Sequence, residues 1–158
     1  MSLRTALLVL VALAAGCKPS LLPGTEIPET KDTRAVYDVL LAYRAALEKR
    51  DPNAVLALVA PSYFDNGGTP EPGDDLDRAG LEASLQKDLP RTEGQKVDFT
   101  IRKIEVSGDD AVAEIFYDSF YRVKTGTKGE TLVARRDSDV SRVRLKRVEG
   151  QWKFVSGL

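Results

Sequence analysis

The chain has 158 residues, with 24 acidic and 23 basic side chains, one cysteine and no histidine. This length suits a single domain, and the near-zero net charge gives no positive field to attract nucleic acid. Without histidine, catalytic triads and histidine metal sites are excluded, and one cysteine forms neither an intramolecular disulfide nor a metal cluster, so we expect no metal and no cofactor.

The N-terminal segment has the pattern of a secretion signal. Arg4 supplies a positive start and residues 6–15 form an uncharged apolar run, but about ten apolar residues are too few to span a bilayer. Residues 13–17 resemble the lipobox of bacterial lipoproteins, with Ala14 where leucine is commonest. The resemblance implies lipidation of Cys17 with fatty acyl chains such as palmitate. The alternative is an ordinary signal peptide whose cleavage site neighbours a cysteine.

The segment after the signal predicts a membrane tether. Residues 17–30 hold three prolines and a glycine without hydrophobic periodicity, which is typical of a flexible linker. We therefore divide the chain into a signal peptide (1–16), a lipidated cysteine with its tether (17–30) and one domain (31–158). By resemblance to Gram-negative lipoproteins, Lys18 implies a place in the cell envelope on the periplasmic face of the outer membrane, in preference to the inner membrane.

Three amphipathic helices are predicted in the first half of the domain. Thr30 can cap a helix over residues 31–49, where apolar side chains recur every three or four positions. Asp51, followed by proline, starts a short buried helix. A third helix over about residues 77–89 has leucines at four-residue spacing and ends at a proline. Between the second and third helices, residues 62–65 predict a brief edge strand.

The second half of the domain, residues 96–158, predicts one curved antiparallel sheet. Its apolar alternation changes phase at residues 102–103, which indicates a β-bulge. Turn residues at 108–110, 125–129 and 149–150 separate the strands, and we expect the third of these strands to begin near residue 140.

Helices followed by a bent antiparallel meander indicate an α+β fold with the helices packed on one face of the sheet. The chain resembles the nuclear transport factor 2-like superfamily, in its SnoaL-like and ketosteroid-isomerase-like branch, in LEKRDPNAVLAL (47–58), VSGDDAVA (106–113) and GQWKFVSG (150–157). The resemblance implies a cone whose ligand enters between the helices and the concave face of the sheet. It says little of activity, since members include isomerases, hydratases, transport factors and binding domains.

Aromatic side chains with a polar tip are candidates for lining a pocket for an apolar ligand. The candidates are Tyr37, Tyr63, Tyr117, Tyr121 and Trp152. The alternative interpretation is that they fill the core and form hydrogen bonds at its rim.

An isomerase of this superfamily would need a carboxylate base in an apolar pocket and donors for an enolate. Asp118, between two phenylalanines, is the first candidate and Asp65 is the second. Strand alternation, however, places Asp118 with Glu114 and Arg122, on the face opposite the tyrosines. This position argues against a catalytic role, and we expect cross-strand ion pairs with the basic residues of 142–146 instead.

We therefore expect a membrane-anchored lipoprotein that acts as a non-catalytic module binding a small apolar ligand or a protein partner. One alternative is a lipoprotein enzyme with an aspartate base in an apolar pocket. Another is a subunit that forms a homodimer through its sheet, because Val112, Phe116 and Phe120 lie among charges on the predicted outer face.

Overall fold

The computed structural model describes residues 20–70, 72–125 and 131–158. The expected signal peptide, Cys17, Lys18 and residues 126–129 of an expected turn lie outside the described residues. In chain order the helices and strands are α1 (Lys31–Lys49), α2 (Pro52–Leu56), β1 (Phe64–Asp65), β2 (Leu76–Asp77), α3 (Arg78–Asp88), β3 (Thr92–Ser107), β4 (Asp110–Thr125), β5 (Thr131–Val148) and β6 (Gln151–Ser156). Within this part of the chain, no helix has the length and apolar character needed to cross a membrane.

The helices begin at the capping residues that the sequence indicates. The Thr30 hydroxyl accepts a hydrogen bond from the backbone N–H of Thr33 at 3.1 Å, which satisfies a free donor in the first turn of α1. The Asp51 and Asp77 carboxylates do the same for α2 and α3. α1 ends at Arg50, whose positive φ of 54° is the left-handed geometry that closes many helices.

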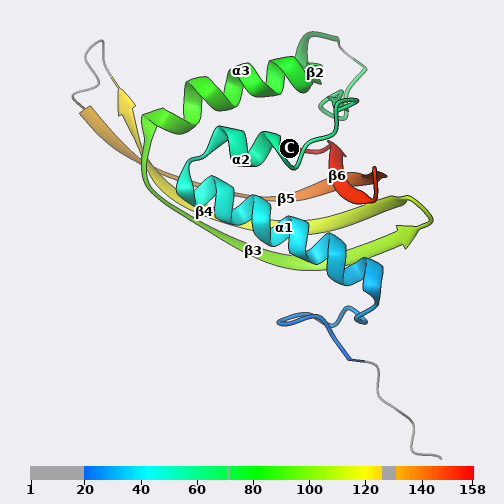
Figure 1. Ribbon diagram of the computed structural model, residues 1–158. Helices are drawn as coiled ribbons and strands as arrows, with labels where there is room; N and C mark the ends of the chain where they lie inside the picture. The colour runs from blue at the N-terminus through cyan, green and yellow to red at the C-terminus, as the bar shows by residue number, and fades with distance from the viewer. Residues whose placement is uncertain (1–19, 71, 126–130) are drawn as a thin grey trace, which may run out of the picture.

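Strands β3 to β6 form a four-stranded antiparallel sheet in chain order, while β1 and β2 form a separate two-stranded ribbon. The pairing of β3 with β4 shifts between Ile101 and Lys103, which confirms the predicted bulge. β5 pairs with β4 over the whole length of β4, but β6 pairs with β5 only from Arg144 to Val148. The first half of β5 is therefore an edge of the sheet, and this end of β4 and β5 projects past the helices (Figure 1).

The strand expected from residue 140 begins at Thr131. Its residues 134–140 are all exposed, so no buried face imposes the apolar alternation by which a strand is recognised. This polar segment is a strand because it pairs with β4, and the local sequence pattern does not reveal that pairing.

The helices are arranged differently from the expected three-helix layer. α1 packs on β3 and β6, α2 packs on α1, and α3 packs on α2. Figure 1 shows α1 along the concave face of the curved sheet, with α3 farther away. The prediction that three helices pack on the sheet is therefore wrong, and α1 is the helix that covers it. α2 has only five residues, and α3 buries only Leu81.

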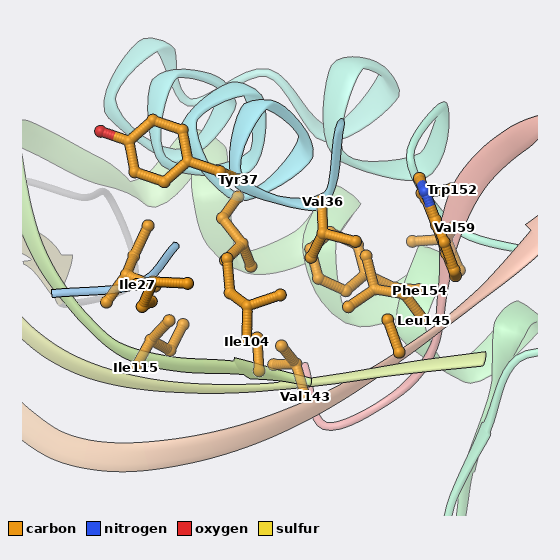
Figure 2. Packing of buried hydrophobic residues seen from close by; sticks show 14 of the residues in the cluster. Ile27, Val36, Tyr37, Val59, Ile104, Ile115, Val143, Leu145, Trp152 and Phe154 are labelled. Carbon is orange, nitrogen blue, oxygen red and sulfur yellow. The ribbon is translucent and has the colours of Figure 1, made fainter. Parts of the chain in front are cut away.

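The core lies between α1 and the concave face of the sheet. Val36 and Leu40 of α1 meet Ile115, Val143 and Phe154 of the sheet, and all five side chains are at most 2% exposed. Figure 2 shows Val36 above Phe154 and Val143, with Ile115 farther along the sheet.

Residues 20–30 also belong to this core. Leu22 is 1% exposed and Ile27 is 8% exposed, and the Leu22 N–H donates to the Ile27 carbonyl at 2.9 Å. The Tyr37 hydroxyl donates to the Pro23 carbonyl at 3.1 Å. These residues are part of the folded domain, which corrects the expectation that they belong to a flexible tether: two isolated apolar side chains in a Pro-Gly turn carry no periodic signal.

Candidate functional site

A cavity of about 200 Å³ lies between α1 and the concave face of the sheet. Its apolar walls are Leu47 of α1, Val97 and Phe99 of β3, and Ile115 and Val143 of the two central strands. Ligand pockets usually measure about 300–1,000 Å³, whereas a cavity of about 150 Å³ holds benzene. The cavity therefore fits one ring or a short chain.

Tyrosine and serine hydroxyls supply the polar part of the cavity wall. Tyr43 of α1 and Tyr117 of β4 face it together with Ser119 and Ser141. The Tyr43 ring packs against Phe99, with centroids 5.8 Å apart. Burial raises the pKa of Tyr43 and of Tyr117, so both phenols keep their protons at neutral pH and can donate hydrogen bonds.

The Tyr43 hydroxyl has no hydrogen-bond partner within residues 20–70, 72–125 and 131–158. A polar group in an apolar wall costs free energy unless it is paired. A ligand or water in the cavity can accept this bond, so Tyr43 is a natural contact for a bound molecule.

A second hollow of about 450 Å³ adjoins the cavity, and the two share Gln95 and Ser119. Its remaining wall combines charged side chains, among them Asp137 and Arg91, with the apolar Leu89 and Val123. We call the cavity and this hollow together the cleft. The cleft thus has an apolar inner part and a charged outer part.

The sequence interpretation missed two carboxylates: Asp137, which lines the outer part of the cleft, and Asp139, beside it on the same face of β5. Asp137 lies opposite Ser119 in the β4–β5 register, and Asp139 lies opposite Tyr117, so both belong to the concave face. Burial is the largest cause of the raised pKa of Tyr117, and the negative charges of Asp137 and Asp139 raise it further. Extending the alternation of β5 backward from Val143 would have placed both aspartates on this face.

The predicted aromatic residues divide into two groups. Tyr117 and Tyr121 lie in the cleft, whereas Tyr37, Tyr63 and Trp152 lie elsewhere. Figure 2 shows Tyr37 and Trp152 at opposite ends of the labelled core residues.

These three aromatic side chains make contacts that stabilise the fold. The Tyr37 hydroxyl donates to the Pro23 carbonyl, as described above. Tyr63 is 2% exposed, and its hydroxyl lies 3.2 Å from both the backbone N–H and the carbonyl oxygen of Leu158. The Arg147 guanidinium carbon lies 4.6 Å from the centroid of the Trp152 ring, over its face. The indole N–H of Trp152 is buried without a hydrogen-bond partner in the described part of the chain.

Neither of the two candidate bases is among the residues that line the cleft, although the hydrogen-bond partner of Asp65, Gly157, does line the cavity. Asp118 is on the convex face, where its carboxylate accepts two hydrogen bonds of 2.9 and 2.6 Å from Arg136. This guanidinium holds the pKa of Asp118 below its ordinary value. The expected pairing of Asp118 with residues 142–146 does not occur, because the register places it opposite Ser138.

The carboxylate of Asp65 accepts a hydrogen bond from the backbone N–H of Gly157. It therefore fastens the end of β6 to β1. Among the residues that the structure describes, no group of acidic or cysteine side chains could hold a metal ion.

Comparisons with known proteins identify the fold. No protein-family model matches the chain, and no curated protein sequence matches it. Several solved structures do: a ketosteroid isomerase-like protein from Erwinia carotovora atroseptica is 15% identical, with a TM-score of 0.65 over 81% of this chain and 94% of that one. A nuclear transport factor 2-like protein of unknown function from Shewanella oneidensis is also 15% identical, with a TM-score of 0.57 over 79% and 95%.

A conserved protein from Planctomyces limnophilus gives a TM-score of 0.63 at 15% identity, over 79% of this chain and 91% of that one. At such identities the likeness concerns the fold alone. The domain thus has the α+β, nuclear transport factor 2-like fold with a curved antiparallel sheet, as the sequence predicts.

Proposed function

We propose that this protein is a membrane-anchored bacterial lipoprotein whose domain binds a small, largely apolar ligand in the cleft and performs no chemistry on it. The observation that carries the binding role is the cavity of about 200 Å³, with apolar walls and protonated tyrosines, that opens into the polar hollow. Apolar concave sites with a few convergent polar groups are typical of ligand pockets.

The anchoring part of the proposal rests on the lipobox at residues 13–17. One acyl chain binds membranes weakly, while two or more give stable anchoring. Replacing Cys17 with serine should move the protein from the membrane to the soluble fraction. Recovery of the unaltered protein as soluble, with an unmodified N-terminus, would refute the anchor; recovery only in inner membranes would refute outer-membrane sorting.

The non-catalytic part is supported by the position of the carboxylates. An enolate-forming enzyme needs a desolvated base near its substrate. Asp118 is held by Arg136 on the convex face, and Asp65 is bonded to backbone. Asp137 lines the outer cleft, but its side chain is exposed to solvent and is not desolvated.

The binding role can be tested with 2-phenylethanol, whose single ring and short chain suit the cavity volume. We expect a dissociation constant on the order of 1 mM, which corresponds to about −4 kcal/mol. Ser141→Phe fills the cavity and should weaken binding at least tenfold by isothermal titration calorimetry.

The matched control is Ser138→Phe. Ser138 is three residues away on β5 but lies opposite Asp118 on the convex face, so this variant should bind normally. Thermal melts would confirm that both variants are folded. Absence of binding to the unaltered protein, or equal binding by both variants, would refute a ligand site in the cavity.

A second candidate role is homodimer formation through the convex face of the sheet. Phe120 is 49% exposed and Val140 is 42% exposed on that face, beside the Asp118–Arg136 pair. A face with apolar side chains and both charges suits a second copy under two-fold symmetry. Phe120→Asp should then convert a dimer to a monomer in sedimentation experiments; a monomeric unaltered protein would exclude this role.

A further inference from the structure

The acidic side chains on the two faces of the sheet differ in their partners. On the convex face Asp118 pairs with Arg136, Glu114 with Arg102 and Asp110 with Lys146, at 2.6, 3.8 and 3.5 Å. On the concave face, Asp137 and Asp139 have no lysine or arginine partner among the residues described. Two carboxylates beside the cleft are therefore available to a bound cation.

These two carboxylates, of which Asp139 accepts a hydrogen bond from the Val140 N–H at 2.7 Å, lie beside aromatic rings. Asp139 is directly opposite Tyr117 and Asp137 is directly opposite Ser119 in the β4–β5 register. Tyr117 faces the apolar cavity, and Tyr121 and Asp137 line the hollow next to it. Carboxylates together with aromatic faces are the groups that bind organic ammonium ions in proteins.

The other charged groups around the hollow form no ion pair with Asp137 or Asp139 among the residues described. Arg91 donates a hydrogen bond to the Lys124 carbonyl at 3.3 Å, and Asp88 accepts one from the Ser84 hydroxyl. Arg135 lies opposite Tyr121, two register pairs beyond Asp137 and on the same face of the sheet. Among the residues that line the hollow, the carboxylates of Asp88 and Asp137 outnumber the single guanidinium of Arg91, while the Arg50 guanidinium donates a hydrogen bond to the carbonyl of Thr92.

Resting on the proposed function, we propose that the ligand of the cleft is a small organic cation. Its ring or short alkyl body occupies the cavity against Phe99 and Ile115. Its ammonium group lies at the outer cleft, near Asp137 and Asp139 and against the rings of Tyr117 and Tyr121. The cavity volume of about 200 Å³ limits the body to a single ring.

The test compares three probes of similar size on the full-length chain by isothermal titration calorimetry: 2-phenylethylammonium, 2-phenylethanol and phenylacetate. The ammonium should bind at least tenfold tighter than the alcohol, and phenylacetate should bind more weakly than the alcohol. Increasing salt should reduce only the preference for the ammonium, because exposed charges are screened.

Variants of the two carboxylates assign the preference to this site. Asp137→Asn combined with Asp139→Asn keeps the shape and one acceptor oxygen at each position. It should reduce the affinity for the ammonium to that for the alcohol measured with the same variant. Asp118→Asn makes the same kind of charge change on the convex face and should preserve the preference.

The outcomes separate this inference from the proposed function. Equal binding of ammonium and alcohol, tighter binding of phenylacetate, or a preference that survives the double substitution would overturn the cation inference while the cavity remains a ligand site. Ammonium binding that is insensitive to Ser141→Phe would also overturn it, since the body would then lie outside the cavity. Failure of the alcohol to bind would overturn the proposed function itself.

Discussion

Substitution of Leu22 by alanine tests whether residues 20–30 belong to the folded domain. The Leu22 side chain is 1% exposed and packs in the main core. Removing buried methyl groups from a leucine costs about 2–5 kcal/mol, and the lower values apply where neighbours can move into the space. Because this segment lies at the periphery of the core, we expect a loss of about 2–3 kcal/mol.

The measurements are urea unfolding and thermal unfolding of the full-length protein, both followed by circular dichroism. At about 2–4 °C per kcal/mol for a chain of this size, the melting temperature should fall by about 4–12 °C. Leu21 is the matched control, because it precedes Leu22 and is 49% exposed. Leu21→Ala should change stability by less than about 0.5 kcal/mol. Equal, small effects of both substitutions would show that the segment is a tether after all.

Three further predictions concern other residues of the fold. Trp152→Ala should destabilise the protein by about 3–5 kcal/mol in the same assay, since the indole is 4% exposed; a near-neutral result would mean that the ring does not pack. The pKa of Asp118, measured by NMR, should lie below its ordinary value and rise in Arg136→Gln; a raised value in the unaltered protein would indicate a desolvated base. Burial raises the pKa of Tyr63 to about 12, so its contribution to stability should be complete below about pH 10 and disappear as the pH rises toward 12. Stability that falls equally between pH 10 and 12 in Tyr63→Phe would contradict this assignment.

Local chemistry made much of the fold predictable. Thr30, Asp51 and Asp77 mark helix starts because a short polar side chain can pair with the free N–H groups of a first turn. The phase change at residues 102–103 predicted a bulge, because side chains alternate strictly between faces unless one residue is inserted. These signals lie within a few residues of the feature that they specify.

The site was predictable only in part. Of the five aromatic residues proposed for their polar tips, Tyr117 and Tyr121 lie in the cleft. It did not identify Asp137 and Asp139, which lie in an exposed strand without an apolar pattern. Tyr43 was not predicted as a site residue, because its spacing within the apolar stripe of α1 is typical of a core position. Its place in the cavity wall depends on how the sheet lies opposite α1.

The sequence by itself determined the element boundaries with strong caps or alternation, the α+β order and the apolar face of each helix. The tertiary structure decided the rest: the packing of Leu22 and Ile27, the extension of β5 to Thr131, and the concave position of Asp137 and Asp139. The physical reason is that each of these depends on a partner far away in the chain. Pairing with β4 makes a polar segment a strand, and packing on a distant core buries an isolated leucine, so no local pattern records either.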